Sequence, residues 1–276
     1  TTMTFKKPAL VFGASGEQGR AVLEGFVDFG YSPVYGFTSN NDTVQDQYLS
    51  DALQCVILEG RLGNPADVKK ALLSTKAQTI FLTTTTEMPV EIGGGYVAAQ
   101  EEEYDCIVNF FQTLKEVFLE DGLSRTVVFS TQDNVQELCR KHYEQTGEVW
   151  IEPLDDGSIV PHFSAKGKGG ETAQEILRDI PQLELILLTT PFLYSNFLAF
   201  FAPLPNEGKT QWELCASFGH GSTKIDMMSV SDLGRVVVNV SENSHQYNGQ
   251  NLRIASERIS MEEIARNFSD LYGKDV

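Results

Sequence analysis

Along this chain, short apolar runs alternate with longer segments in which apolar residues recur every three or four positions. The short runs predict buried strands, and the longer segments predict amphipathic helices. Strands that alternate with helices are joined by crossover connections, which favours a parallel, doubly wound α/β sheet covered by helices. We expect strands at residues 9–13, 33–38, 55–60, 79–84, 126–131 and 184–190, and helices near residues 17–29, 65–74, 97–119 and 166–179.

The helix expected at residues 97–119 has the clearest periodicity. Its apolar face is formed by Tyr104, Ile107, Val108, Phe111, Leu114 and Phe118. The opposite face carries the run Glu101, Glu102 and Glu103, which we interpret as a solvated surface.

The alternation breaks down after residue 190, where aromatic residues are mixed with turn residues. We expect a small carboxyl-terminal α/β lobe here, packed over the carboxyl edge of the sheet, where substrate clefts form. Two further helices are expected at residues 229–240 and 260–273. Ser260 and Glu263 have the spacing of a capping box, so the second of these helices begins after Ser260.

Composition excludes several classes of partner. The 276 residues are 41% hydrophobic and 21% charged, as is typical of globular proteins. The 38 acidic and 21 basic residues give a net charge of -17, which repels nucleic acid. No apolar run approaches the roughly 20 residues of a membrane helix, and no charged-then-apolar export signal is present. We therefore expect a cytoplasmic protein that binds neither nucleic acid nor membrane directly.

The four cysteines are Cys55, Cys106, Cys139 and Cys215. Their wide spacing provides no CxxC pair and no cluster with histidine. The sequence therefore predicts neither a metal site nor a disulfide framework.

Three glycines follow the first strand in the segment LVFGASGEQGRAVLEG, residues 10–25. Glycine permits a tight turn and a close approach of the backbone to a diphosphate, and the following helix presents free N–H groups and partial positive charge. The alternative is a glycine turn with a structural role only. On the first interpretation, the phosphates are bound by Gly13, Ser15, Gly16, Gln18 and Gly19.

The choice between NADP and NAD is not decided by charge. An acidic residue after the second strand favours NAD and a basic one favours NADP, but this chain has Ser39 and Asn40 there. Asp42 lies slightly farther along, and the nearest basic candidates are Arg20 and Arg61.

Ketone reduction of the usual short-chain type needs a tyrosine four residues before a lysine, so that the ammonium lowers the pKa of the phenol. None of the nine tyrosines has lysine at that offset. Lys166 instead lies four residues after His162, near an expected helix start with Ser164 as a candidate cap. His162 is either a proton donor or a packing residue.

Four stretches together resemble the NmrA-like family of atypical short-chain dehydrogenases, which is itself similar to the isoflavone reductase group. They are VFGASGEQGRAV, VVFST, PHFSAKGKGGETAQEIL with the later LTTPFLYSNF, and IDMMSVSDLGRVVVNV.

The resemblance implies an NADP(H)-binding Rossmann domain, a small carboxyl-terminal lobe and a lysine, Lys166, near the nicotinamide ribose. On this basis residues 1–155 form the Rossmann core, and residues 156–276 supply the remaining core strand and helices plus the substrate or partner lobe. Two positions depart from the family pattern. Ser39 and Asn40 replace a basic residue, and Arg61 replaces an acidic one, which restores NADP preference if Arg61 reaches the 2′-phosphate.

Further candidates lie at the ends of the fourth, fifth and sixth strands. Thr84, in the run Thr83 to Thr86, is assigned to cofactor binding and precedes a loop containing Gly93, Gly94 and Gly95, which is either a lid or a connector. Ser130 and Thr131 offer hydroxyls to a carbonyl oxygen or act as strand-end caps. PFLYSNF, residues 191–197, lines the cleft or forms aromatic core.

Members of the resembled family are either reductases that use the lysine without the tyrosine or dinucleotide sensors that regulate partner proteins. We favour a sensor because the tyrosine is missing and the charge is acidic. The alternative is an NAD(P)H-dependent reductase of a small hydrophobic carbonyl, enone or quinone, with Lys166 as the catalytic residue. We expect NADP(H) as the cofactor, with NAD(H) not excluded, and the sequence does not determine the oligomeric state.

Overall fold

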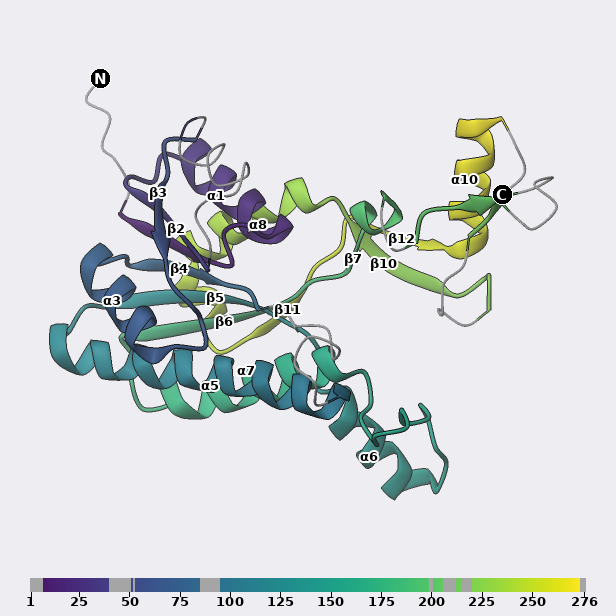
Figure 1. Cartoon of the computed structure of the whole chain (residues 1–276), viewed down its shortest axis with the longest axis horizontal. Coiled ribbons are helices and arrows are strands. Elements are labelled where there is room, and N and C mark those ends of the chain that lie inside the picture. The colour runs from purple at the N-terminus through teal and green to yellow at the C-terminus, as the bar shows by residue number, and fades with distance from the viewer. Residues whose placement is uncertain are drawn as a thin grey trace. The chain divides into compact units, whose positions relative to one another are not determined.

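The computed structural model describes residues 7–39, 51, 53–84, 95–198, 201–205, 212–214 and 220–273. The chain divides into two compact units (Figure 1). The larger comprises Thr1–Thr189 with Leu233–Leu252, and the smaller comprises Thr190–Asp232 with Arg253–Val276. Both units are therefore discontinuous in sequence, and each is described by itself.

A seven-stranded sheet forms the centre of the larger unit, with the strand order β11-β6-β5-β4-β1-β2-β3. Its strands are β1 (Ala9–Phe12), β2 (Val34–Thr38), β3 (Val56–Glu59), β4 (Thr79–Leu82), β5 (Arg125–Thr131), β6 (Leu183–Thr189) and β11 (Asn251–Arg253). The strands from β1 to β6 pair in parallel. The chain runs outward from β1 to β3 and then crosses to β4 on the other side of β1. This reversal marks a topological switch point at the carboxyl ends of β1 and β4, the kind of place where α/β proteins bind ligands.

All six strands expected from the apolar runs are present, with ends that differ by a residue or two. Four of the expected helices are present in the larger unit as α1 (Glu17–Asp28), α3 (Pro65–Thr75), α5 (Gly95–Asp121) and α7 (Pro161–Leu177). The Rossmann-type doubly wound α/β fold predicted from the sequence is confirmed. No helix of the described residues combines the length and the apolarity needed to cross a membrane.

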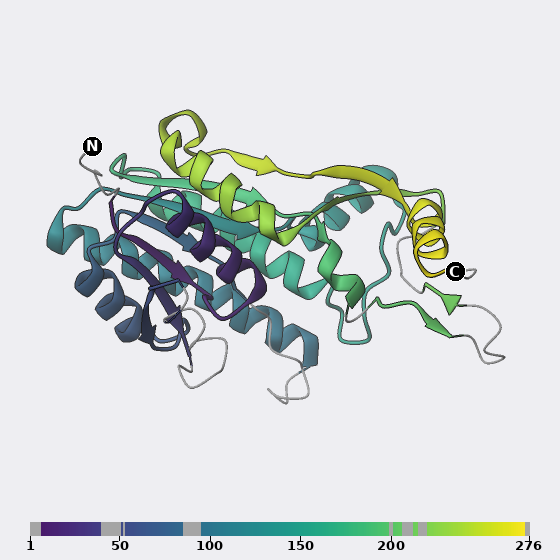
Figure 2. The same cartoon turned by 90° about the horizontal axis from the view of Figure 1, so that it is seen from above.

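Helices cover both faces of the sheet (Figure 1). α3, α5 and α7 lie on one face, where Leu72, Phe110 and Phe129 belong to one buried cluster. α1 lies on the other face beside α8 (Val230–Glu242), as Figure 2 also shows. α5 buries Ile107, Phe111 and Leu114 as its periodicity predicted, so the apolar stripe of this helix is the main cover of its face.

Two helices differ from the expectation. α7 begins at Pro161, five residues earlier than residue 166, because proline is well suited to the first position of a helix. α6 (Val135–Thr146) was missed, since it buries only Cys139 and so lacks an apolar stripe. Its ends carry recognisable signals all the same: Asn134 caps its first turn, and Gly147 ends it in the left-handed conformation.

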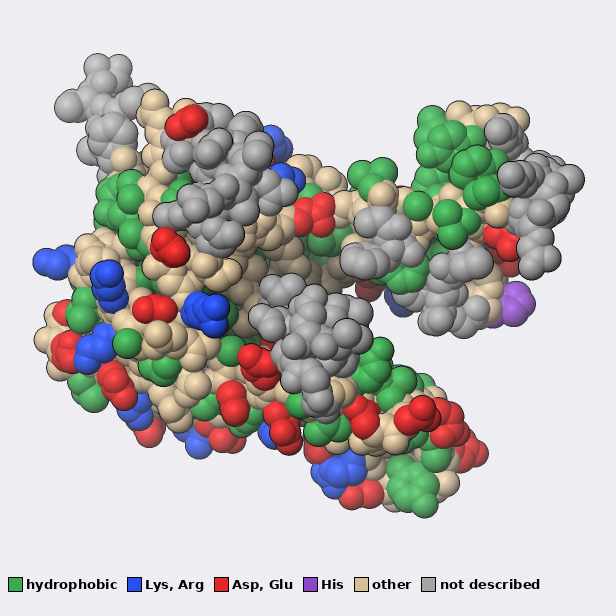
Figure 3. Space-filling view, in the orientation of Figure 1, with side chains coloured by type: hydrophobic (Ala, Val, Ile, Leu, Met, Phe, Trp, Pro, Cys, Tyr) green, Lys and Arg blue, Asp and Glu red, His purple; other side chains and the backbone are tan. Residues whose placement is uncertain are grey.

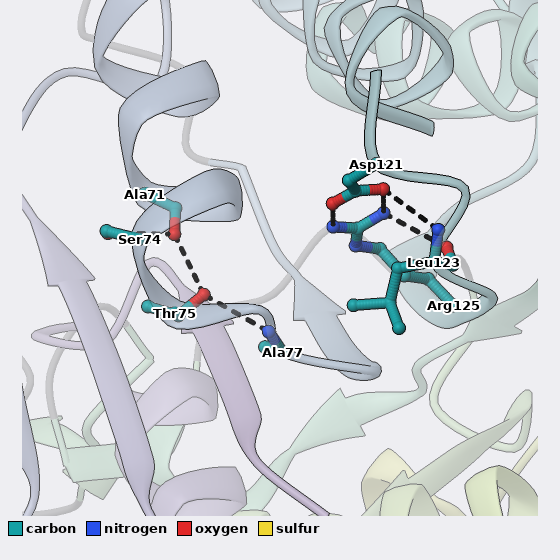
Figure 4. Close-up of polar contacts among 7 residues, drawn as sticks. All are labelled: Ala71, Ser74, Thr75, Ala77, Asp121, Leu123 and Arg125. Atoms are coloured by element: carbon teal, nitrogen blue, oxygen red, sulfur yellow. Dashed lines mark hydrogen bonds and ion pairs between the residues drawn. The ribbon is translucent and has the colours of Figure 1, made fainter. Parts of the chain in front are cut away.

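Side-chain hydrogen bonds hold two junctions at the amino edge of the sheet (Figure 4). Where α5 leads into β5, the fully buried guanidinium of Arg125 pairs with Asp121 and donates to the carbonyl of Leu123 at 3.0 Å. Where α3 leads into β4, the hydroxyl of Thr75 donates to the carbonyl of Ala71 at 2.8 Å. These junctions fix where β4 and β5 begin, and therefore where their carboxyl ends lie.

The smaller unit has a three-stranded sheet in the order β12-β10-β7. Phe197, Met227 and Ile264 form its buried core, against which Phe192 packs. Residues 191–197 therefore contribute to an aromatic core, as one of the two interpretations holds. The capping box expected at Ser260 and Glu263 is confirmed. The elements are β7 (Phe192–Leu193), β10 (Lys224–Met228), β12 (Glu257–Ser260), the 3-10 helix Tyr194–Leu198, α10 (Met261–Tyr272) and the strand pair β8 (Leu204–Pro205) and β9 (Trp212–Glu213).

α1 and α8 touch through their backbones where Gly25 faces Gly234. A Cβ on Gly25 would lie 2.7 Å from the Cα of Gly234, and a Cβ on Gly234 would lie 2.2 Å from the carbonyl oxygen of Ala21. Real Cβ atoms do not approach other atoms so closely. Glycine at both positions therefore sets the distance between these helices.

We predict that Gly234→Ala lowers the free energy of unfolding by about 2 kcal/mol and the melting temperature by about 5 °C. The expected loss is net of the stability that alanine normally adds to a helix. Thermal unfolding measures it, with the exposed Asn239→Ala on the same helix as the matched control. A Gly234→Ala protein as stable as the wild type would show that the helices have room for the methyl group.

Candidate functional site

The turn between β1 and α1 requires glycine at two of its three glycine positions. Gly13 has φ +80°, and a Cβ there would lie 2.6 Å from Cγ2 of Thr83. A Cβ on Gly19 would lie 2.0 Å from the carbonyl oxygen of Gly13. Gly16 is exposed and its φ of -75° is open to any residue, but a Cβ there would lie 3.3 Å from the carbonyl oxygen of Gly13. Sterics therefore require glycine at positions 13 and 19, and they disfavour a side chain at Gly16 more mildly.

Gly16 is the N-cap of α1, and no side chain caps this helix end. The first amides of a helix have no partner within the helix, so they need an acceptor from elsewhere. Their N–H groups and the helix dipole together attract anions. A glycine at this exposed position keeps the helix end open to a ligand.

Two hydrogen bonds tie this turn to the neighbouring strands. The hydroxyl of Thr38, at the end of β2, donates to the hydroxyl oxygen of Ser15 at 3.1 Å. The hydroxyl of Ser130, near the end of β5, donates to the side-chain oxygen of Gln18 at 2.7 Å. These two bonds fix the turn relative to the carboxyl ends of β2 and β5. Ser130 was considered as a carbonyl ligand, and its hydroxyl hydrogen is used here to hold α1.

Lys166 belongs to α7, and its side chain reaches the carboxyl end of β4. Its ammonium donates to the carbonyl oxygen of Thr84 at 2.8 Å and is 3.8 Å from Oε1 of Glu103. The Thr84 hydroxyl donates to the same Glu103 oxygen at 2.6 Å. The side chain of Glu103 is 1% exposed and that of Lys166 is 12% exposed. We call Lys166, Thr84 and Glu103 the lysine cluster.

Burial lowers the pKa of Lys166 from its usual 10.5, because water no longer solvates the ammonium, while Glu103 opposes this shift. Thr131 donates a hydrogen bond to the backbone carbonyl of Lys166 at 2.9 Å, so the end of β5 fixes α7 at this point. A Cβ on Gly167 would lie 2.1 Å from the amide nitrogen of Asn134. The close approach of α7 to the segment after β5 therefore depends on Gly167, and it positions Lys166.

Glu103 is the residue that sequence reasoning assigned wrongly. It was expected on a solvated face, but it is buried with 3% of its surface exposed. It lies four residues before Ile107 and seven before Phe110, so it falls on the buried stripe of α5. That spacing was a usable signal, which the run of three glutamates concealed.

Ser164 was expected to cap the helix that carries Lys166, and this expectation is wrong. Ser164 lies inside α7, because the helix begins at Pro161. Its hydroxyl donates to the carbonyl of Ile159 at 2.6 Å and accepts from the amide of Gln136 at 3.1 Å. It therefore satisfies an amide in the first turn of α6 instead.

His162 lies one helical turn before Lys166, and its ring packs edge-on against Phe163. Desolvation lowers the pKa of His162 below 6.5, and the positive charge of Lys166 lowers it further. The imidazole is therefore predominantly neutral at pH 7.

The residues considered for the adenosine end lie after β2 and β3. Ser39 is exposed, and the amide of Gly60 donates to the carbonyl of Thr38 at 2.9 Å, which keeps the ends of β2 and β3 together. The amide of Arg61 donates to Asp67 at 3.0 Å, while its side chain is exposed. Asn40 lies outside the described residues.

The remaining candidates fall partly outside the described residues. This applies to residues 85–94, which include Gly93 and Gly94 of the expected lid or connector, and to Cys215. Gly95 starts α5 with φ +76°. The described part of the chain holds no group of three or more metal-ligating side chains.

Comparison with known proteins supports the resemblance stated from the motifs. Residues 150–276 match the model of the NmrA-like family. The fold is similar to that of NmrA, a negative transcriptional regulator, crystallised in complex with NAD and with NADP. Each of these structures has a TM-score of 0.74 and 16% identity over 99% of this chain and 74% of NmrA. The resemblance to the NmrA-like family is therefore confirmed in residues 150–276, and the fold is that of NmrA.

The enzyme WbmF of Bordetella bronchiseptica, in complex with NAD+, has the same fold with a TM-score of 0.68. It is 16% identical over 99% of this chain and 80% of WbmF.

The proximity of Lys166 to His162 has a measurable consequence. We predict that Lys166→Met raises the pKa of His162 toward 6.5, because the variant removes a positive charge that disfavours the imidazolium. NMR titration of the imidazole protons measures this value. An unchanged or lower pKa of His162 in the variant would contradict the described proximity.

Proposed function

We propose that this chain, whose carboxyl-terminal residues match the NmrA-like family, binds a nicotinamide dinucleotide and acts as a dinucleotide sensor through protein partners. The observation that carries the proposal is the uncapped amino terminus of α1 at the point where the strand order reverses between β1 and β4. Gly13 and Gly19 are required by sterics there, and Gly16 leaves the helix end uncapped. Gly16 is exposed and has an ordinary φ, so a purely structural turn would require glycine there less strictly than at Gly13 or Gly19.

The diphosphate is assigned to this helix end. We propose that the first amides of α1, with Ser15 and Gln18, hydrogen-bond its oxygens. The net charge of -17 disfavours anions in general, so binding depends on the local field of this helix end. NmrA, which shares the fold, has been crystallised with NAD and with NADP.

The nicotinamide end is assigned to the lysine cluster. Lys166 lies at the carboxyl end of β4, on the same edge of the sheet as the glycine turn, and its ammonium has donor capacity beyond the bond to Thr84. We propose that it binds the nicotinamide ribose. Arg61 follows β3 with an exposed side chain and is assigned to the 2′-phosphate of NADP, with Ser39 and Asn40 at the adenine ribose.

A sensor is favoured over an enzyme because neither His162, which stands in place of the usual tyrosine, nor Tyr194 is a good proton donor. His162 occupies the place of the usual tyrosine, but its lowered pKa keeps it neutral at pH 7. Tyr194, in the smaller unit, donates its hydroxyl to Glu257, and desolvation together with this carboxylate raises the pKa of Tyr194 to about 12.

A regulatory role exerted through proteins also agrees with the surface charge. Figure 3 shows acidic side chains spread over α5 and α6, and the described residues of this face show no continuous basic patch. NmrA is itself a negative transcriptional regulator. A protein partner, and not nucleic acid, is therefore the target that we propose.

The second candidate function is reduction of a small hydrophobic carbonyl, enone or quinone. The spacing of His162 and Lys166 favours it, because this pair replaces the usual tyrosine and lysine. In such a reaction the bound dinucleotide would supply a hydride, and Lys166 would assist proton transfer.

We predict that NADPH with a panel of quinones, enones and aldehydes is oxidised no faster in the presence of this protein than without it. The fall in NADPH absorbance with time, at a saturating concentration of protein, measures the rate of oxidation. Turnover well above the background that disappears in Lys166→Ala, while NADPH affinity survives, would establish the reductase instead.

Two substitutions at Gly16 test the diphosphate assignment. Asp and Asn are equally good N-caps and have nearly the same shape, so both variants meet the same 3.3 Å approach of Cβ to the Gly13 carbonyl oxygen and should be about equally stable. We predict that Gly16→Asp weakens NADP and NAD binding by more than about 100-fold, because its carboxylate repels the diphosphate. Gly16→Asn, the matched control, should retain binding within about tenfold.

Calorimetric titration and the thermal shift on ligand addition provide the readouts for these variants, since a ligand of the native state raises its stability. The wild type should bind NADP more tightly than NAD if Arg61 contacts the 2′-phosphate. Equal binding by Gly16→Asp and Gly16→Asn would place the diphosphate elsewhere.

A further inference from the structure

The lysine cluster contains one charged group that the proposed function does not use. Glu103 is almost completely buried, and it belongs to a helix whose other inward residues are mainly apolar. Its Oε1 accepts from the Thr84 hydroxyl at 2.6 Å and lies 3.8 Å from the Lys166 ammonium.

A buried ion pair of this kind contributes little to the free energy of folding. Removing two charges from water costs several kcal/mol per ion, and the attraction between them offsets this only when the geometry is close. Here the ammonium and the carboxylate are 3.8 Å apart, and the shorter bond of Lys166 goes to the Thr84 carbonyl. The arrangement is better explained by control of Lys166 than by packing.

We infer that Glu103 is a positioning residue, whose buried carboxylate holds the Lys166 ammonium at the end of β4 and so sets how strongly this lysine binds the nicotinamide ribose. This inference rests on the proposed function. Glu103 acts through Lys166 and Thr84.

Two features of the geometry support this role. Thr84 offers both its hydroxyl, to Glu103, and its carbonyl, to Lys166, so the three residues form a closed cluster that connects α5, β4 and α7. The carboxylate accepts the Thr84 hydroxyl at 2.6 Å and lies 3.8 Å from the ammonium, which keeps hydrogens for a ligand beyond its bond to the Thr84 carbonyl. The carboxylate also compensates the positive charge in a site that water reaches poorly.

Glu103 opposes the lowering of the Lys166 pKa by burial. Burial lowers the pKa of Lys166 and the carboxylate opposes that effect, so removal of the carboxylate lowers this pKa further. The groups that face the ammonium are Glu103 on α5, the Thr84 carbonyl after β4, and His162 on α7. His162 stays neutral above pH 7, since its pKa is lowered from 6.5.

The test measures NADPH affinity by fluorescence titration between pH 7 and 9.5 for Glu103→Gln, Lys166→Met and the double variant. Glu102→Gln, an exposed neighbour on the same helix, is the matched control. Gln keeps the shape of Glu103 and accepts the Thr84 hydrogen bond, so it changes only the charge. Thermal unfolding confirms that each variant folds, and Glu103→Asp tests rescue by a carboxylate.

We expect Glu103→Gln to lose about tenfold in NADPH affinity at pH 9, with the loss beginning at a lower pH than in the wild type. The ammonium is the better donor to the ribose, and in this variant it deprotonates earlier. Glu103→Asp should recover part of the affinity. In the Lys166→Met background, Glu103→Gln should have no further effect on binding.

Two results would overturn the inference. One is the same loss of affinity from Glu103→Gln with and without Lys166, which would show a purely structural role. The other is an unchanged pH profile.

A wild type that binds neither NADPH nor NADH would overturn the proposed function separately. In that case NMR titration of the Lys166 ammonium in the ligand-free protein decides the electrostatic part. A pKa lower in Glu103→Gln than in the wild type supports the hold on Lys166, and equal values refute it.

Discussion

The contact between Gly19 and the carbonyl of Gly13 is the constraint on which the rest of the site depends. A side chain at Gly19 would overlap that carbonyl, with 2.0 Å between Cβ and oxygen. Because both residues lack a Cβ, α1 starts immediately after β1 and points its uncapped end at the carboxyl edge of the sheet. The strand order reverses between β1 and β4 at the same place, so the uncapped helix end lies at the switch point where α/β proteins bind ligands.

From this turn, contacts extend to the ends of β4 and β5 and from there to Lys166. Thr83 packs against Gly13, and the next residue, Thr84, holds Lys166. The Gln18 side chain accepts from Ser130 at the end of β5, while Thr131 beside it fixes the backbone of Lys166. The glycine turn and the lysine cluster are thus parts of one framework of contacts. Such preorganisation reduces the ordering that a ligand must impose when it binds.

The sequence predicted those parts of the structure that depend on local periodicity. The strands, α1 and α5 are buried on well-defined faces, so their apolar spacing located them, and the glycine spacing indicated the turn. α6 was missed because it packs through Cys139 alone and has no apolar stripe. The early start of α7 was missed because periodicity does not reveal where proline begins a helix.

Glu103 shows why the site was harder to predict than the fold. Its position on the buried stripe of α5 was visible in the spacing, but its partners come from β4 and α7, far away in sequence. Only the tertiary structure brings these residues together. It places Glu103, a residue type common on solvated faces, in a buried position beside Lys166. Ser164 was misassigned for the same reason, since its hydroxyl serves a neighbouring helix.

The central claim is that the open end of α1 binds the diphosphate of a nicotinamide dinucleotide. A crystal structure of the protein grown with NADP tests it most directly. The account predicts diphosphate oxygens within hydrogen-bond distance of the first amides of α1, and the nicotinamide ribose beside Lys166. A dinucleotide bound elsewhere, or a turn left empty at saturating NADP and NAD, would contradict it.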